Sequence, residues 1–172
     1  HLLEKGSTKS LGKFEEQIPN ELISQDELIA EAVRKFGGNV VMTSENHKSG
    51  TDRCNEAFSI INKPFDVIIN VQGDEPFIQP QQIEALKSCF DSSEVQLATL
   101  VKAFKKEDGF DTLFNPNSPK VVINKQNEAI YFSRSIVPYI RDVHHTEWLD
   151  KHTFYKHIGM YAYRADVLNK IT

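Results

Sequence analysis

Two adjacent carboxylates, Asp74 and Glu75, follow an apolar, β-branched run at 67–71 in the stretch DVIINVQGDEPFIQP. The run has the length of one buried strand, and Gly73 and Pro76 favour a turn directly after it. In open α/β sheets ligands bind at the carboxyl ends of strands, and carboxylates there suit a hard cation such as Mg²⁺, held together with substrate phosphates. The alternative on this pattern alone is an ordinary turn with solvated acids.

Two further segments carry polar groups. The loop GSTKSLGKF at 6–14 combines glycines, hydroxyls and lysines, and such a loop can point N–H groups and an ammonium at phosphates. A solvated, partly ordered N-terminus is the alternative, because no strong strand precedes this loop and no clear helix follows it. The segment HKSGTDR at 47–53 lies at the carboxyl end of a short strand at 40–42 and leads into a helix at 54–61.

The elements that must position these groups alternate along the chain. The spacing of Ser24 and Glu27 predicts a capping box, apolar residues recur at helical spacing as far as Phe36, and Gly37-Gly38 ends that helix. Further strands are expected at 40–42, 67–71, 97–101 and 155–163, further helices at 54–61, after Pro80 and at 166–171, and a hairpin at 120–123 and 129–132. This order predicts a single α/β domain over 1–172, with a mostly parallel sheet covered on both faces. The hairpin would leave that sheet as an antiparallel excursion or add an antiparallel edge to it.

Composition narrows the class of protein. The chain has 172 residues, of which 40% are hydrophobic, so one domain with a real core is expected. With a net charge of −4, the chain does not have the excess of basic residues typical of a nucleic-acid binder. No apolar run has the length of a membrane span, and no signal peptide is visible. Cys54 and Cys89 fall on apolar helical faces, so we expect reduced, buried thiols of a cytoplasmic protein, without a disulfide or metal pair.

Five motifs occur in a fixed order between residues 30 and 170: VVMTSENHKSGTDR, VIINVQGDEPF, FNPNSPKVVI, AIYFSRSIVPYIRD and KHIGMYAYR. Together they resemble those of the 3-deoxy-manno-octulosonate cytidylyltransferases, the CMP-Kdo synthetases of Gram-negative lipopolysaccharide assembly, and the last two favour Kdo over sialic acid. The resemblance implies a Rossmann-like nucleotidyltransferase that converts CTP and Kdo to CMP-Kdo and pyrophosphate with Mg²⁺, the anomeric hydroxyl attacking the α-phosphorus. In such transfers positioning and charge neutralisation provide most of the acceleration.

The resemblance also assigns nucleotide-binding residues. Asp74 matches the magnesium ligand and the principal catalytic residue, and Gln72 matches a residue near the ribose and base. The three residues Ser49, Gly50 and Thr51 would place main-chain and hydroxyl groups against the cytosine edge, because a glycine lets backbone approach a planar base.

Two residues of the HKSGTDR segment keep alternative roles. Arg53 would either face the nucleotide or form a structural ion pair at the start of its helix. His47 is expected to shape the loop and not to act as a catalytic base.

Three residues match the sugar site of the family. Arg134 in YFSRS matches the sugar-binding arginine, and a guanidinium suits the Kdo carboxylate because two parallel N–H bonds can form. His157 and Tyr161 in HIGMY match residues around the bound sugar, and their i, i+4 spacing on a strand predicts that they point to the same face. On pattern alone, two half-buried strand side chains would explain this pair equally.

The hairpin region at 119–139 is the predicted homodimer interface. Val121, Ile123, Ile130 and Phe132 lie on strands for which no covering helix is evident in the sequence. Exposed apolar strand edges are usually paired or buried, and the resemblance also implies a dimer. No nucleic-acid or membrane partner is expected.

The departures from the family pattern lie near the ends of the chain. STKSLGKF keeps the Ser-Thr and Gly-Lys spacing of the triphosphate-binding signature, so Lys13 is assigned to the nucleotide, but Lys9 replaces an arginine and two prolines are missing. Between Lys13 and Ser24 there is little room for the family's helix and second strand, and a second metal-binding aspartate would lie beyond Thr172. We therefore expect an incomplete synthetase. A catalytically inactive member that only folds, dimerises or binds nucleotide is the alternative, and a related nucleotidyltransferase or glycosyltransferase-like module is a weaker one.

Overall fold

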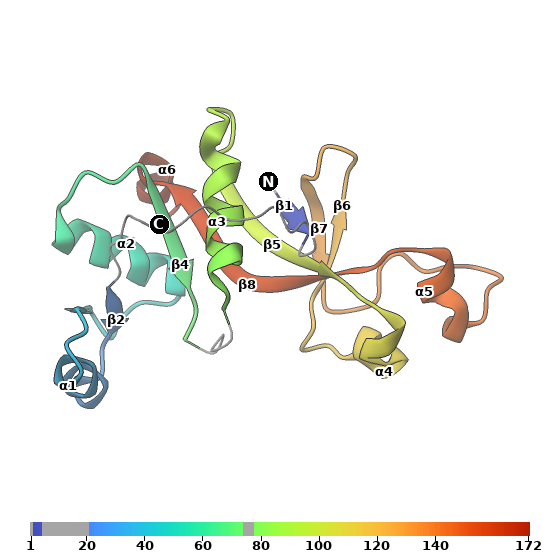
Figure 1. Ribbon diagram of the computed structural model, residues 1–172, viewed down its shortest axis with the longest axis horizontal. Coiled ribbons are helices and arrows are strands. Elements are labelled where there is room, and N and C mark those ends of the chain that lie inside the picture. The colour runs from blue at the N-terminus through green and yellow to red at the C-terminus, as the bar shows by residue number, and fades with distance from the viewer. Residues whose placement is uncertain (1, 5–20, 74–77) are drawn as a thin grey trace. The chain divides into compact units, whose positions relative to one another are not determined.

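The computed structural model describes residues 2–4, 21–73 and 78–172, so Lys13, Asp74 and Glu75 lie outside the described residues. Contacts between Cα atoms divide the chain into two units. The first unit comprises residues 71–162 together with the strand at 2–4, and the second comprises residues 21–70 and 163–172 (Figure 1). Because each unit has its own strands and helices, they are described separately.

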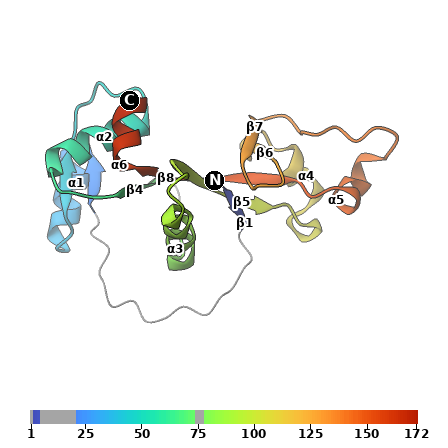
Figure 2. The same cartoon turned by 90° about the horizontal axis from the view of Figure 1, so that it is seen from above.

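The first unit is built on a mixed sheet. Its elements are β1 (Leu2–Glu4), α3 (Pro80–Ser88), β5 (Leu97–Ala103), α4 (Phe110–Phe114), β6 (Lys120–Ile123), β7 (Ala129–Ser133), α5 (Trp148–Lys151) and β8 (Tyr155–Arg164), the last two residues of β8 belonging to the second unit. Short 3₁₀ turns span Cys89–Asp91, Lys106–Asp108 and His145–Glu147. The strand order is β1-β5-β8-β6-β7, with β1 parallel to β5 and β6 antiparallel to both β7 and β8 (Figure 2). The hairpin therefore adds an antiparallel edge to the sheet and does not leave it.

The core of the first unit consists of side chains buried between the sheet and the helices. Residues 98–101 of β5 are buried without a break, because side chains cover both faces of this strand, and α3 packs beside it (Figure 1). A second cluster consists of Phe104, Leu113, Trp148 and Phe154. The Trp148 indole N–H donates to the carbonyl oxygen of Val143 at 3.0 Å. This aromatic cluster anchors the short helices α4 and α5, which are too short to be stable alone.

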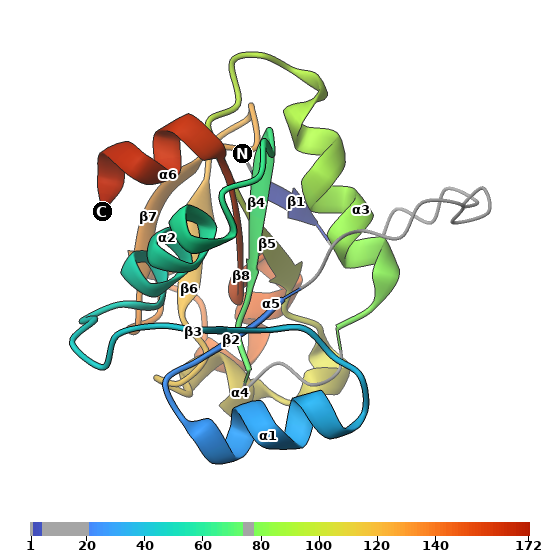
Figure 3. The same cartoon turned by 90° about the vertical axis from the view of Figure 1, so that its left-hand side faces the viewer.

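The second unit contains a parallel strand pair and four further elements. They are β2 (Leu22–Ser24), α1 (Glu27–Lys35), β3 (Val40–Met42), α2 (Gly50–Ile61), β4 (Val67–Val71, whose last residue belongs to the first unit) and α6 (Ala165–Ile171). β2 and β3 pair in parallel, α1 lies against them, and α2 lies next to α6 (Figure 3). Its buried hydrophobic residues are Ala30, Val33, Val41, Cys54, Ala57, Tyr163 and Leu168. Each helix of the unit thus contributes an apolar face to the interior.

The start of α1 differs from the predicted capping box. Asp26 is the N-cap, and its carboxylate Oδ1 accepts the backbone N–H groups of Leu28 at 2.8 Å and Ile29 at 3.4 Å. Ser24 cannot take that place because it ends β2, where its carbonyl oxygen accepts the N–H of Thr43 at 3.0 Å. The other end agrees with the prediction, since Gly37 has a φ of +81° and follows the C-cap residue Phe36.

The α/β class is confirmed, and most predicted elements are present. The structure adds the strand β2 and the short helices α4 and α5, which the sequence patterns did not predict because three to five residues are too few to show a period. The strand β4 has its predicted bounds but is half-buried, with an exposed Val71, and is not fully buried.

Two predictions about side-chain exposure have different outcomes. Cys54 and Cys89 are free and buried, as predicted. Val121, expected at the dimer surface, is instead buried in a cluster with Val101. Among the described residues, no helix combines the length and apolar character required to cross a membrane.

Candidate functional site

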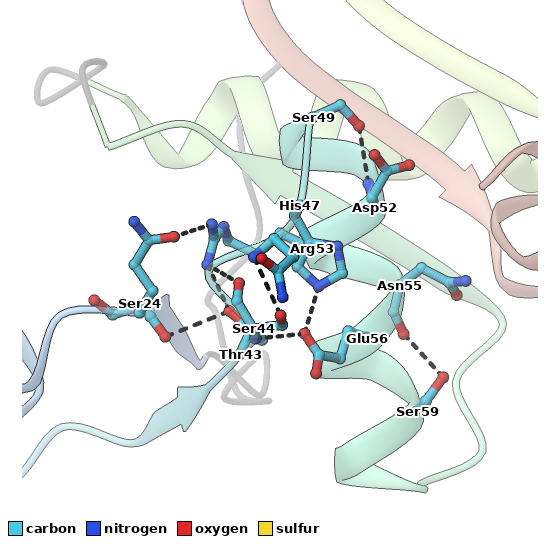
Figure 4. Close-up of polar contacts among 12 residues, drawn as sticks. Ser24, Thr43, Ser44, His47, Ser49, Asp52, Arg53, Asn55, Glu56 and Ser59 are labelled. Atoms are coloured by element: carbon cyan, nitrogen blue, oxygen red, sulfur yellow. Dashed lines mark hydrogen bonds and ion pairs between the residues drawn. The ribbon is translucent and has the colours of Figure 1, made fainter.

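The HKSGTDR segment forms the start of α2. The hydroxyl of Ser49 accepts the backbone N–H of Asp52 at 3.1 Å and caps the helix, so the helix begins at Gly50 and not at the predicted residue 54 (Figure 4). Ser49 and Gly50 are exposed, and Thr51 is half-buried. The three predicted cytosine-binding residues therefore lie at one helix N-terminus, where backbone N–H groups remain available to a ligand.

Side chains from two other strands of the second unit meet this helix start. The Thr51 hydroxyl lies 3.3 Å from the hydroxyl of Tyr163, a buried residue near the end of β8. A Cβ atom placed on Gly50 would lie 3.8 Å from the side-chain nitrogen of Asn70 on β4. Sequence reasoning missed Asn70 and Tyr163 as neighbours of the motif. For Asn70 a signal existed, because it is the one polar residue inside the apolar run VIINV.

Arg53 is engaged by the protein itself. Its Nη1 donates to the hydroxyl of Thr43 at 2.8 Å and to the carbonyl oxygen of Ser44 at 3.2 Å, and its Nη2 donates to the side-chain oxygen of Gln25 (Figure 4). These contacts favour the structural alternative for Arg53. They are hydrogen bonds to neutral oxygens, however, and not the ion pair that was expected.

Glu56, one turn after Arg53, binds the loop that precedes the helix. Its Oε2 accepts the backbone N–H of Ser44 at 2.8 Å and lies 2.5 Å from Nε2 of His47 (Figure 4). The hydrogen bond from His47, followed by that from Ser44, lowers the pKa of the Glu56 carboxyl. His47 therefore has the loop-shaping contact expected of it, and Glu56 is its partner, which no sequence motif had indicated.

The predicted sugar-binding residues lie in the first unit. The ring centroids of His157 and Tyr161 are 5.1 Å apart, so the two residues share a face of β8, as their spacing predicted. The rings of Phe132 and His157 form a T-shaped pair with centroids 5.4 Å apart. Nε2 of His157 lies 2.8 Å from the hydroxyl of Thr99. Burial lowers the pKa of His157 and raises that of Tyr161, so both are neutral near pH 7.

Gln72 and Arg134 contact different parts of the first unit. A Cβ atom on Gly159 would lie 3.3 Å from the side-chain oxygen of Gln72, so the absence of a side chain at 159 lets Gln72 approach β8. The guanidinium of Arg134 is exposed, and its Nη1 donates to the carbonyl oxygen of Pro116 at 2.9 Å.

A cavity of about 1010 Å³ opens beside Tyr161 in the first unit. Tyr161, Phe132 and Thr99 line it, and the last two also contact His157. Its charged lining residues are Asp91, Glu94 and Glu128. Such a lining suits the hydroxyl groups of a ligand better than a carboxylate.

Metal-binding side chains do not cluster in the part of the chain that the structure describes. Within residues 2–4, 21–73 and 78–172, no three His, Cys, Asp or Glu residues lie close enough together to hold a metal ion. Asp74 carries the carboxylate oxygens that Mg²⁺ prefers, but it lies outside the described residues.

A family model described as cytidylyltransferase matches residues 22–172, which include most of both units. The chain belongs to the cytidylyltransferase family. Its similarity to one member, the 3-deoxy-manno-octulosonate cytidylyltransferase of Parabacteroides distasonis, is 63% identity over 150 residues, covering 87% of this chain and 60% of that protein. The protein of the same name from Phocaeicola vulgatus is 58% identical over 149 residues, which cover 87% of this chain and 59% of that protein. This cytidylyltransferase chain thus spans about 60% of the length of its curated relatives.

A solved structure gives the corresponding comparison of fold. It is a CMP:2-keto-3-deoxy-manno-octonic acid synthetase complexed with CTP, with a TM-score of 0.75 and 38% sequence identity. The match covers 87% of the cytidylyltransferase chain and 58% of the synthetase chain. Of the predicted site residues that are described, Ser49, Gly50, Thr51 and Arg53 lie in the second unit, and Gln72, Arg134, His157 and Tyr161 lie in the first.

Proposed function

We propose that this protein transfers CMP from CTP to Kdo, giving CMP-Kdo and pyrophosphate for lipopolysaccharide synthesis. The observation that carries the proposal is the 63% identity, over 150 residues, to a protein named 3-deoxy-manno-octulosonate cytidylyltransferase. The fold is proposed to be one Rossmann-like nucleotidyltransferase domain with a mostly parallel sheet, because the family match runs through both units.

CTP is proposed to bind at the start of α2. Ser49, Gly50 and Thr51 would hold the cytosine edge through main-chain N–H groups and hydroxyls, and the N-terminal end of the helix favours an electronegative ligand atom. Arg53 would keep the preceding loop in place through its bonds to Thr43 and Ser44. Gln72 is proposed to contact the nucleotide, and Lys13 to contact the triphosphate.

Kdo is proposed to bind in the first unit. His157 and Tyr161 present neighbouring rings whose polar atoms suit sugar hydroxyls, and Tyr161 lines the cavity. Arg134 would bind the carboxylate, since its guanidinium is exposed and offers further N–H groups besides the one bonded to Pro116.

Asp74 is proposed to be the magnesium ligand. Bound Mg²⁺ would neutralise phosphate charge during the transfer. The remaining positioning would fall to the residues described above, because a transfer of this kind needs no nucleophile from the protein. We further propose a cytoplasmic homodimer formed through the hairpin region.

Pyrophosphate release from purified protein tests this function. We expect turnover with CTP, Kdo and Mg²⁺, loss of turnover when the metal is chelated, and slower turnover when UTP replaces CTP or sialic acid replaces Kdo. Binding of CTP without any turnover would instead support a catalytically inactive, nucleotide-binding member of the family. A preference for UTP would contradict the proposed cytosine site.

A further inference from the structure

The side chain of Lys120 is fully buried at the first position of β6, with 0% of its surface exposed. Its ammonium donates to the carbonyl oxygen of Asn115 at 2.8 Å and to that of Arg134 at 3.3 Å. Within the part of the chain that the structure describes, Lys120 forms no ion pair. A buried ammonium without a counter-charge is costly, so an apolar residue would serve packing better at this position.

The two carbonyls that Lys120 binds belong to two different segments of the chain. Residues 115–119 form the connection from α4 to β6, and the ammonium ties the first residue of this connection to the end of the hairpin. The Arg134 guanidinium donates to the next carbonyl, that of Pro116, at 2.9 Å. Lys120 therefore fixes both the main chain of Arg134 and the turn that the Arg134 side chain contacts.

The same turn also holds His157. The backbone N–H of His157 donates to the carbonyl oxygen of Pro119 at 2.8 Å. Two residues of the proposed sugar site, Arg134 and His157, thus both bond to residues 115–119, and the buried Lys120 bonds to Asn115 of the same connection.

Two further cationic residues are neighbours of Lys120 in the register of the described sheet. In the sheet it pairs with Ser133 on β7 and with Lys156 on β8, and Arg134 follows directly after Ser133. Burial lowers the pKa of Lys120, as expected for a cation without a nearby carboxylate. Among the described residues, Lys120, Lys156 and Arg134 thus bring three cationic side chains to this part of the first unit, where an anionic ligand would be favoured.

We propose that Lys120 is a positioning residue for the sugar acid. Its buried ammonium holds Arg134 in the position that binds the carboxylate of the ligand, and it adds positive charge that favours this carboxylate. This inference rests on the proposed function and deepens it, since it explains selectivity for an acidic sugar. It differs from a purely structural role because it concerns the sugar acid and leaves CTP binding unaffected.

Steady-state kinetics of Lys120→Met test the inference, with Lys125→Met as the matched control. Lys125 lies in the exposed turn of the same hairpin. We expect Lys120→Met to raise the KM for Kdo about tenfold and leave the KM for CTP within about twofold, whereas Lys125→Met changes neither. Lys120→Arg should restore part of the affinity for Kdo, and the preference for Kdo over its neutral carboxamide should shrink in the methionine variant.

The outcomes separate this inference from the proposed function. If the wild-type protein releases no pyrophosphate from CTP and Kdo, the proposed function is wrong. If it does so and Lys120→Met keeps the wild-type KM for Kdo, or raises both KM values equally, the inference is overturned. If the methionine variant does not fold, Lys120→Gln and Lys120→Arg replace it, since both keep donors and only arginine keeps the charge. Equal KM values for Kdo in these two, or failure of both to fold, would also count against a positioning role.

Discussion

Nε2 of His47 lies 2.5 Å from Oε2 of Glu56, and this contact joins the loop before α2 to the helix itself. The same carboxylate atom accepts the backbone N–H of Ser44, so one oxygen binds both ends of a four-residue segment. The segment leads directly into Ser49, Gly50 and Thr51. The geometry of the proposed cytosine site therefore depends on a glutamate that would not itself touch the nucleotide.

Replacing Glu56 with Gln should weaken CTP binding without unfolding the protein. The substitution removes the negative charge that strengthens both hydrogen bonds, so we expect CTP affinity to fall about threefold to tenfold and the Ser44 amide to exchange faster with solvent. Titration calorimetry and hydrogen exchange measure these changes. Glu31→Gln, on the exposed face of α1, is the matched control. Unchanged CTP affinity and Ser44 exchange in the Glu56 variant would show that the loop does not need this carboxylate.

Asp74→Asn should keep the fold and remove more than about 99% of turnover. The change is nearly isosteric, but it removes a negative charge expected to hold the metal against the phosphates. CTP should still bind through the start of α2, which does not require the metal. Pyrophosphate release, thermal unfolding and CTP binding are compared with those of Asp66→Asn, an exposed aspartate just before β4. Turnover close to that of the control would exclude Asp74 as the principal magnesium ligand.

The neutral state of His157 should make stability fall in mild acid. Burial lowers its pKa in the folded protein below the unfolded value of about 6.5, so the unfolded chain binds the proton more readily. The stability that the neutral His157 ring contributes is present above about pH 6.5 and is lost as the pH falls through the pKa of the folded protein. Urea unfolding between about pH 5 and 7.5 should show a shallower loss for His157→Gln than for the wild type. His152→Gln, at an exposed histidine, should follow the wild type, and identical slopes in all three proteins would contradict the prediction.

Periodic patterns predicted the long elements well because their signals are local. The strands β3 and β8 and the hairpin strands have the expected positions within a few residues, since each contains a run rich in β-branched or aromatic residues. The ends of helices were less accurate. Ser24 has the spacing of a helix cap, but a strand pair formed with residues almost twenty positions later commits it to β2 and leaves the cap to Asp26.

The candidate site shows the same division between local and distant contacts. The motif HKSGTDR predicted a helix that in fact begins four residues earlier, at Gly50. The partner of Arg53 at Gln25 lies 28 positions away, and that of Thr51 at Tyr163 lies 112 positions away. Neither partner has a spacing that the sequence alone would reveal. Lys120 illustrates the limit most clearly: its type suggests an exposed residue, and only the packed sheet shows that it is buried.

The exposed edge strand β7 should mediate dimer formation. Ile130, Tyr131 and Phe132 are 64%, 59% and 44% exposed, and an edge strand with apolar side chains on both faces favours pairing with another chain. We expect Ile130→Asp to convert a dimer into a monomer in sedimentation velocity experiments. Ile60→Asp, at a similarly exposed isoleucine of α2, should remain dimeric. A wild-type protein that sediments as a monomer would refute the dimer.

Cys54 should make the protein less stable in alkali. Its thiol is 4% exposed, and burial raises its pKa from 9.0 to about 11. As the pH rises, the thiol therefore loses its proton in the unfolded chain before it does so in the folded protein. The stability contributed by the neutral, buried thiol is complete below about pH 9 and disappears as the pH rises through about 11. Two pKa units correspond to on the order of 2–3 kcal/mol.

The difference between wild type and Cys54→Ala isolates this contribution. Tyrosine and lysine groups titrate in the same range, but they do so in both proteins and cancel when the free energies of unfolding are subtracted. We expect the advantage of the wild type over Cys54→Ala to shrink between about pH 9 and 11, measured by urea unfolding under reducing conditions. Alkylation of Cys54 in the folded protein should be slow over the same range, because the neutral, buried thiol is a poor nucleophile. A free-energy difference that stays constant with pH, or rapid alkylation near pH 8, would show that the thiol is not held neutral by burial.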